Sequence, residues 1–343
     1  MAGFASRRRS SWATRPARDA GARVVEPRRF AVLVLAAFAL ALPFFLWDFR
    51  TYQLAFAFAN AIAVLGLNLI AGQAGLISLG HGAFYGLGAY TLAVLMRHWG
   101  VSAYAAIPAA ALVGFISGYV FGRVVTRLIG FYLALTTFAV TLALPQMLKS
   151  SYVSPWTGGV QGLYLDRPGP PLRLPVTPDQ WWYFVTLGIL ALLLWMTRNL
   201  VDGRIGRAIR AMRDDPIAAQ AMGIDIPRYT ALTFGLGAAY AGVAGALAAL
   251  LLDFIAPESF TYWLSIFFLV GSVFGGMTSV WGAVAGGLLL QFWPDVAGMV
   301  SRDLVYPVFG ALLVLSMRFM PNGVAGAVSV WRRLPTWATR ARL

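Results

Sequence analysis

The chain has 343 residues, of which 59% are hydrophobic and only 12% are charged, and its mean hydropathy is +0.71. A soluble domain carries about 25% charged residues, so this composition excludes a soluble protein and predicts an all-α polytopic membrane protein. The absence of cysteine excludes a disulfide framework or thiolate metal site, and the net charge of +14 lies in loops, so we expect no nucleic-acid partner.

The chain begins with an arginine-rich stretch, residues 1–29, followed by the apolar run Phe30–Trp47. The apolar core of a signal peptide is only about 7–15 residues long and ends in small residues. This run is longer and ends in the bulky Phe44-Phe45-Leu46-Trp47. We therefore expect a retained first membrane helix after a basic cytoplasmic tail.

A spanning helix needs about 20 apolar residues, and this rule predicts about ten segments, or eight to ten, in a membrane domain of residues 30–320. In chain order they are Phe30–Trp47, Tyr52–Ala71, Leu76–Met96, Ala103–Gly122, Leu128–Leu148, Trp181–Met196, Tyr229–Leu252, Tyr262–Gly276, Ser279–Trp293 and Asp303–Met320. The short pair 262–276 and 279–293 forms either two crossings or a re-entrant hairpin, because glycine crowds this region.

The distribution of arginine in the loops predicts the orientation of these segments. It places the N-terminal tail, the loop 198–229 and the C-terminal tail 321–343 in the cytoplasm. The nearly neutral loop 149–180 then lies on the outer side. The sequence therefore predicts a multi-pass protein of a bacterial-type inner membrane with both termini in the cytoplasm.

The predicted helix interiors hold almost no ionisable residue apart from His81. Ion-coupled carriers place such residues at membrane depth, so a self-powered carrier is disfavoured. The single lysine, Lys149, lacks the glycines of a phosphate-binding loop, so the chain has no ATPase site of its own. Ser78 and His81 have the spacing of one helix face, but no third group orients a base, so we expect no enzyme.

The stretch Gly66–Tyr90 combines polar residues with a glycine density that disrupts a simple helix. A break at Gly72–Gly75 would start a new helix near Leu76, and broken helices present backbone dipoles to polar substrates. In the alternative interpretation, His81 only bonds a neighbouring carbonyl in a tightly packed bundle.

The loop Arg198–Tyr229 is the most charged interval of the chain. Asp214-Asp215-Pro216 is typical of a helix start, and Gly223 suits a helix end, which predicts a short helix over Ile217–Met222. Four arginines spaced by three precede it, at positions 204, 207, 210 and 213. This basic stripe faces either water or lipid headgroups, and the short helix suits a groove on a cytoplasmic subunit.

Three segments of the sequence resemble the membrane permeases of branched-chain amino acid ABC importers. They are Gly66–Tyr90, Gly203–Tyr229 and Val270–Gly287, and the outer TGGVQGL at Thr157–Leu163 is also similar. The arginine-rich N-terminus and the outer RPGPPLRLP depart from that pattern. The resemblance does not fix the solute, because relatives are associated with branched-chain amino acids, urea, short amides and aromatic acids.

The resemblance implies a second permease subunit (the same or a different chain), two cytoplasmic ATPases that bind ATP, an extracytoplasmic binding protein and surrounding lipid. It implies an ATPase-coupling loop with Arg207, Arg210, Arg213, Asp214, Asp215, Pro216, Ala218, Ala219, Met222 and Gly223. It also implies a translocation path near Asn68, Gly72, Gln73, Gly75, Ser78, His81 and Gly82. The alternatives are a membrane scaffold that recruits a cytoplasmic protein and a stand-alone secondary carrier.

Overall fold

The structure, a computed structural model, describes residues 38–128, 130–171 and 175–300, with short pieces between 308 and 326. The chain divides into two units, residues 1–42 and 43–343. In the first unit, residues 38–41 are helical, and the short 3-10 turn η1 (Leu42–Phe44) begins at the last residue of this unit. The second unit contains the other elements.

Long apolar helices account for most of the second unit. They are α2 (Asp48–Leu67), α3 (His81–Trp99), α4 (Ala103–Val124), α5 (Phe131–Lys149), α7 (Pro178–Asp202), α10 (Ile226–Leu252), α11 (Tyr262–Gly275) and α12 (Gly282–Val300). The shorter elements are η2 (Asn68–Gln73), η3 (Val125–Arg127), α6 (Ser154–Thr157), η4 (Gly159–Gln161), β1 (Leu163–Tyr164), α8 (Arg204–Asp214), α9 (Pro216–Ala221), β2 (Phe254–Ile255) and η6 (Pro257–Phe260).

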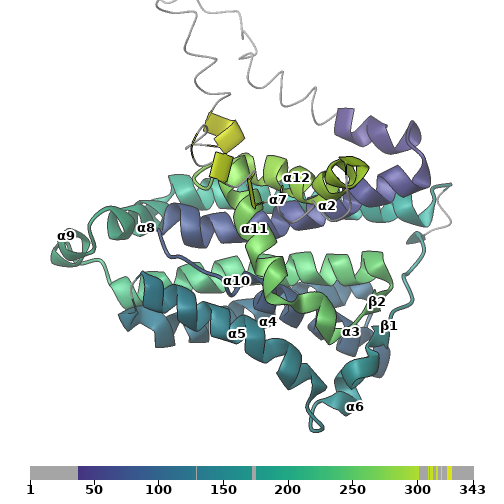
Figure 1. Ribbon diagram of the computed structural model, residues 1–343, viewed down its shortest axis with the longest axis horizontal. Coiled ribbons are helices and arrows are strands. Elements are labelled where there is room, and N and C mark those ends of the chain that lie inside the picture. The colour runs from purple at the N-terminus through teal and green to yellow at the C-terminus, as the bar shows by residue number, and fades with distance from the viewer. Residues whose placement is uncertain are drawn as a thin grey trace, which may run out of the picture. The chain divides into compact units, whose positions relative to one another are not determined.

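The long helices of this unit form two layers (Figure 1). Helices α2, α7 and α12 lie in one layer, α3, α4, α5 and α10 lie in the other, and α11 crosses between them. Helices α8 and α9 lie at one end of the bundle, and α6, β1 and β2 lie at the opposite end. The two polar regions of the chain are therefore separated by the length of the membrane helices.

Helices α2 and α10 form the centre of the bundle, where they pack against each other and against both layers. Glycine permits the close approach of α4 to α10: a Cβ at Gly114 or Gly118 would meet the backbone of Ala238 or Phe234. Small residues allow helix backbones to associate tightly in lipid. Helices α4, α5 and α7 keep most of their surface outside this core.

Ion pairs and a small sheet close the β1–β2 end. Leu163 pairs with Ile255 in the antiparallel β1–β2 ladder. Arg167 binds Asp179 at 2.7 Å and Asp253 at 3.4 Å, joining the loop between α5 and α7 to the start of α7 and the end of α10. Lys149, the last residue of α5, binds Glu258 of η6 at 2.6 Å.

The all-α polytopic membrane fold expected from the sequence is confirmed. Five described helices, α2 with η2, α4, α5, α7 and α10, are long and apolar enough to cross a membrane. Residues 30–37 of the predicted segment Phe30–Trp47 lie outside the described residues, and so does most of Asp303–Met320. The short pair is an antiparallel hairpin of α11 and α12, in which Gly271 packs against Gly286, and Gly275 against Gly282. At 14 residues, α11 is shorter than a full span.

Candidate coupling and translocation site

Three segments that lie far apart in the sequence meet at the α8–α9 end of the bundle. They are the π-helix η2, helix α8 and the turn 276–281 between α11 and α12. Gly72 is their meeting point: Arg213 Nη1 donates to Gly72 O at 2.6 Å. On its other side, a Cβ at Gly72 would overlap the carbonyl oxygen of Met277. Only glycine permits this approach of two backbones.

Buried amides hold the α11–α12 turn against the end of α2. Asn68 Nδ2 donates to Ser279 O at 3.2 Å, and Gln73 Nε2 donates to Thr278 O at 2.9 Å. Ser272 Oγ in turn donates to Asn68 Oδ1. Both amide side chains are buried, and a buried polar group needs such partners. Asn68 and Gln73 therefore fix the turn, and their side chains are buried within this chain.

Residues 74–80 form a non-helical segment between η2 and α3, which we name the re-entrant segment. The sequence predicts a helix start near Leu76, and this is wrong by five residues, because α3 begins at His81. In this segment, side-chain hydroxyl groups of α5 replace the backbone hydrogen bonds that a helix would make. Thr137 Oγ1 accepts from Leu79 N at 3.0 Å, and Thr141 Oγ1 donates to Leu79 O at 2.9 Å. Ser78 precedes α3, so it does not share a helix face with His81.

His81 is fully buried at the start of α3. Its Nε2 lies 2.8 Å from Ala63 O, and the adjacent Gly82 N donates to Ser265 Oγ of α11 at 2.9 Å. The structure thus agrees with the alternative in which His81 bonds a neighbouring carbonyl. Ala63 precedes Gln73 by ten residues of α2 and η2, which corresponds to about 15 Å along a helix. Helix α3 therefore begins well inside the bundle.

Helix α8 packs one face against the re-entrant segment. Ile209 and Met212 are buried in a cluster with Ala74, and Leu76 packs against the same cluster. A Cβ at Gly75, whose φ is +69°, would lie 2.8 Å from Arg213 Cγ. The membrane-embedded break and the polar loop are therefore one packed unit.

Three of the four stripe arginines cap the ends of helices. Arg207 Nη1 donates to Asp202 O at 3.2 Å, and Arg210 Nη1 donates to Val201 O at 2.9 Å, both at the end of α7. Arg213 caps Gly72. The last carbonyls of a helix lack intrahelical partners and carry partial negative charge, so cations stabilise them. The stripe keeps exposed surface at Arg204, Arg207 and Arg213, but its guanidinium groups also bond within the chain, which the sequence did not predict.

Helix α9 projects beyond α8 (Figure 1) and is capped as the sequence predicts. Asp215 Oδ1 accepts from Ile217 N at 2.9 Å and from Ala218 N at 3.0 Å. Pro216 occupies the first turn, and Gly223 follows the helix with φ +83°. Asp214 is instead the last residue of α8. Ala219 is buried, whereas the side chains of Ile217 and Met222 are 82% and 84% exposed.

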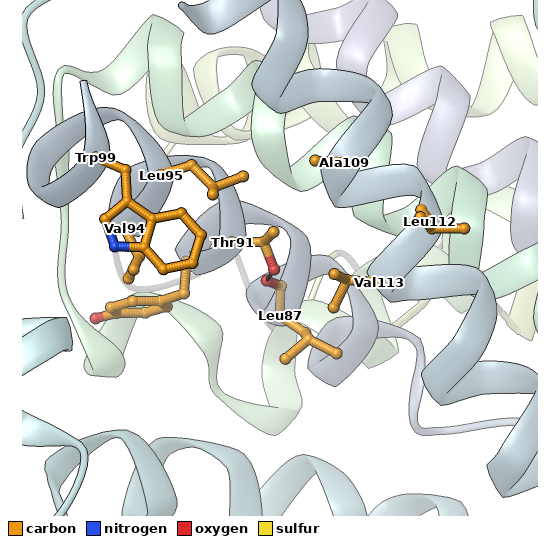
Figure 2. Close-up of a pocket in the computed structure, with 9 residues that line it drawn as sticks. Leu87, Thr91, Val94, Leu95, Trp99, Ala109, Leu112 and Val113 are labelled. Carbon is orange, nitrogen blue, oxygen red and sulfur yellow. Dashed lines mark hydrogen bonds between the residues drawn. The ribbon is translucent and has the colours of Figure 1, made fainter. Parts of the chain in front are cut away.

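A cavity of about 440 Å³ lies away from these residues, between α3 and α4. Figure 2 shows its lining, which is almost entirely apolar, with Leu87, Val94, Trp99 and Leu112 among the side chains. Thr91 Oγ1 already donates to Leu87 O at 2.7 Å. The cavity therefore offers little to a polar solute. In the described ranges, no group of three or more His, Asp or Glu side chains is placed to hold a metal.

Comparison with known proteins identifies the family. Residues 50–317 match the branched-chain amino acid transport system / permease component family. The chain belongs to this family. The permease is 31% identical to the high-affinity branched-chain amino acid transport system permease protein LivM of Salmonella typhimurium over 328 residues, which cover 87% of this chain and 75% of the relative. It is 32% identical to LivM of Escherichia coli over 291 residues, covering 76% of this chain and 66% of the relative. It is 29% identical to LivH of E. coli over 300 residues, covering 79% and 92%. No solved structure matches the permease.

The three segments that meet at Gly72 all lie within the matched residues of the permease. Sequence reasoning missed the contacts that bring them together, and it also missed the hydroxyls of Thr137, Thr141 and Ser265. The glycines at 72 and 75 were a usable indication of close backbone approach. Nothing in the local sequence indicates which hydroxyl groups bond the re-entrant segment, because these residues lie on distant helices.

Proposed function

We propose that this permease is the transmembrane subunit of an ATP-binding-cassette importer. It forms the path for branched-chain amino acids or a related small polar solute that an extracytoplasmic binding protein delivers. A second permease subunit, the same chain or a different one, completes the path. Two separate cytoplasmic ATPase subunits bind ATP and supply the energy, and the chain itself is not an enzyme.

The observation that carries this proposal is the exposed apolar surface of α9. Ile217 and Met222 are 82% and 84% exposed on and directly after a helix of only six residues. So short a helix is marginal alone, and exposed apolar groups at a polar end of the molecule suit a partner's groove. The partner in this proposal is the ATPase, and the loop 198–229 is the coupling loop, with its coupling residues between positions 207 and 223.

The contacts of α8 supply a route from α9 to the membrane helices. Closure of the ATPases moves α9, and α8 follows because Asp215 joins the two helices directly. Arg213 then displaces Gly72, and with it the re-entrant segment and the α11–α12 turn. The site residues inferred for coupling and those inferred for translocation are therefore mechanically connected.

The proposed function requires a particular orientation of the helix bundle in the membrane. The α8–α9 end faces the cytoplasm, together with the tail 1–29 and the tail 321–343, and the loop 149–180 faces the binding protein. Gly323 supports this arrangement, because a Cβ there would meet the backbone of Gly276 in the α11–α12 turn. The chain therefore returns to the α8–α9 end after α12, as an inner-membrane protein with both termini inside would require.

The test is reconstitution with the ATPase, binding protein and partner permease in liposomes. We expect solute-stimulated ATP hydrolysis and uptake, both abolished in Ile217→Asp, which also fails to co-purify with the ATPase. The matched control is Val160→Asp, which changes a side chain that is 70% exposed at the opposite end and should leave ATPase binding intact. Full ATPase binding and stimulation in Ile217→Asp would contradict the proposal. Uptake by the isolated chain under an ion gradient would indicate a secondary carrier, and ATPase recruitment without uptake a scaffold.

A further inference from the structure

The re-entrant segment has an exposed side, which includes Gly75 but none of the other inferred path residues. Ile77 is 50% exposed and Gly75 is also exposed. Their neighbours Asn68, Gln73 and Ser78 are buried inside the bundle of this single chain. Gly75 and Ile77 of the re-entrant segment therefore lie at the surface, and the buried Asn68, Gln73 and Ser78 lie behind them.

The backbone of this exposed side is open. Among residues 75–78, Leu76 N donates to Ile70 O at 3.0 Å. Within the described part of the chain, the N–H groups of Gly75 and Ile77 have no acceptor, and the carbonyls of residues 75–77 have no donor. An unpaired backbone group costs about 1–3 kcal/mol when it is buried without a partner. These groups therefore require a polar environment.

The position of the segment in the membrane makes this requirement strict. It runs from Gln73, at the end of the continuous α2–η2 helix, to His81, which is level with Ala63. That range covers about 15 Å of depth at the rise of a helix. Non-helical backbone at membrane depth is tolerated only when it is buried in protein or lines a water-filled cavity. A dry protein interface would leave the open groups unpaired, whereas water or a polar solute satisfies them.

We propose that residues 75–77 form a wall of the aqueous translocation path. Their open N–H and C=O groups bind the charged groups of a small zwitterion, and the side chain of Ile77 contacts its aliphatic part. Asn68, Gln73 and His81 support this wall from behind. The inference rests on the proposed transport function and adds the surface that the solute meets. Because Arg213 holds Gly72 and packs on Gly75, the wall moves with α8.

The absence of cysteine from the chain permits a direct test in the assembled transporter. Ile77→Cys and Ile116→Cys are made in the full chain, and opened native membranes are treated with a charged, water-soluble methanethiosulfonate reagent. Ile116 is the matched control, because it is the same residue type, is 53% exposed and lies on the outer surface of α4. Labelling is followed as a mass shift, alongside uptake by the unlabelled variants.

We expect the thiol of Ile77→Cys to react at least about tenfold faster than that of Ile116→Cys, because only a hydrated thiol ionises readily to the reactive thiolate. Equal, slow reaction of both thiols would overturn the inference. So would an Ile77→Cys variant whose thiol is protected from the reagent and cross-links to the second permease subunit. If uptake persists in either case, the transport function stands and only the wall is wrong. A complex that shows no uptake even with the unsubstituted chain would instead contradict the proposed function.

Discussion

Arg213 and Gly72 are 141 positions apart, yet Arg213 Nη1 donates to the carbonyl oxygen of Gly72 at 2.6 Å. The bond joins the last turn of α8 to the end of the helix that begins at α2. Hydrogen bonds from charged donors are among the stronger ones in proteins. This contact is therefore a strong direct link between the polar loop and the non-helical break after η2.

Loss of the hydrogen bond from Arg213 to Gly72 should weaken the coupling of ATP hydrolysis to uptake more than loss of the charge at Arg204. We expect Arg213→Ala to lose most solute uptake while ATP hydrolysis continues, because α8 then no longer holds Gly72. The cost to stability should be about 1.5–3 kcal/mol, the value of a hydrogen bond to a charged group. The measurement is uptake per ATP hydrolysed in liposomes. Arg204→Ala is the control, since Arg204 is exposed and makes no hydrogen bond or ion pair within the described residues. Equal ratios in both variants would argue against the contact as the transmission point.

Adding a single methyl group should have opposite effects on stability at Gly72, which is tightly packed, and at Gly188, which has open space. Gly72→Ala places a Cβ onto the carbonyl of Met277, a backbone atom that cannot move without shifting the α11–α12 turn. Overpacking of this kind costs about 1–3 kcal/mol or more. Gly188→Ala in α7 meets nothing within 4 Å and should stabilise the helix by up to about 1 kcal/mol. Thermal unfolding in detergent, compared for the two variants, measures the difference. An unchanged melting temperature for Gly72→Ala would show that the turn yields easily.

Asp214 and Asp215, the two adjacent aspartates of the proposed coupling loop, should behave differently. Asp215 accepts two backbone bonds at the start of α9, and loss of such a cap costs about 1 kcal/mol. We expect Asp215→Ala to weaken ATPase binding several-fold because α9 frays, and Asp215→Ser to restore most of it. Asp214→Ala should bind the ATPase normally, since Asp214 is not a cap. Affinity measured with the detergent-solubilised permease checks this order. A larger effect at Asp214 would mean that its charge contacts the ATPase directly.

The Lys149–Glu258 pair predicts a pH-dependent stability at the β1–β2 end. The hydrogen bond from Lys149 lowers the pKa of the Glu258 carboxyl below its ordinary value. A lowered pKa in the folded state contributes stability above the unfolded pKa of about 4.3, and this contribution is lost as the pH falls through the folded value. Lys149→Met should therefore melt slightly below the unsubstituted protein at pH 7, and the gap should close in strong acid. Glu258→Gln is the control and should not add to Lys149→Met. A gap that persists at all pH values would assign the effect to packing.

The sequence predicted those features that follow from local pattern. Apolar length located the membrane helices, and Asp215-Pro216 with Gly223 located α9, because caps depend on adjacent residues. The start of α3 was wrong because Thr137 and Thr141 bond Leu79 across 58 and 62 positions, which no local pattern encodes. The capping role of the arginine stripe was missed for the same reason. Spacing shows that its side chains share a face, but the carbonyls they cap belong to α7 and η2.

The enclosure of α2 and α10 by the other helices has a consequence for the response to the lipid. Hydrophobic mismatch acts on the helices that touch acyl chains, which tilt or distort the bilayer to match its thickness. In this permease α4, α5 and α7 leave most of their surface exposed, whereas α2 and α10 are mostly buried. A thinner or thicker membrane should therefore tilt the periphery first. The helix that carries Gly72 should keep its length and position across membranes of different composition.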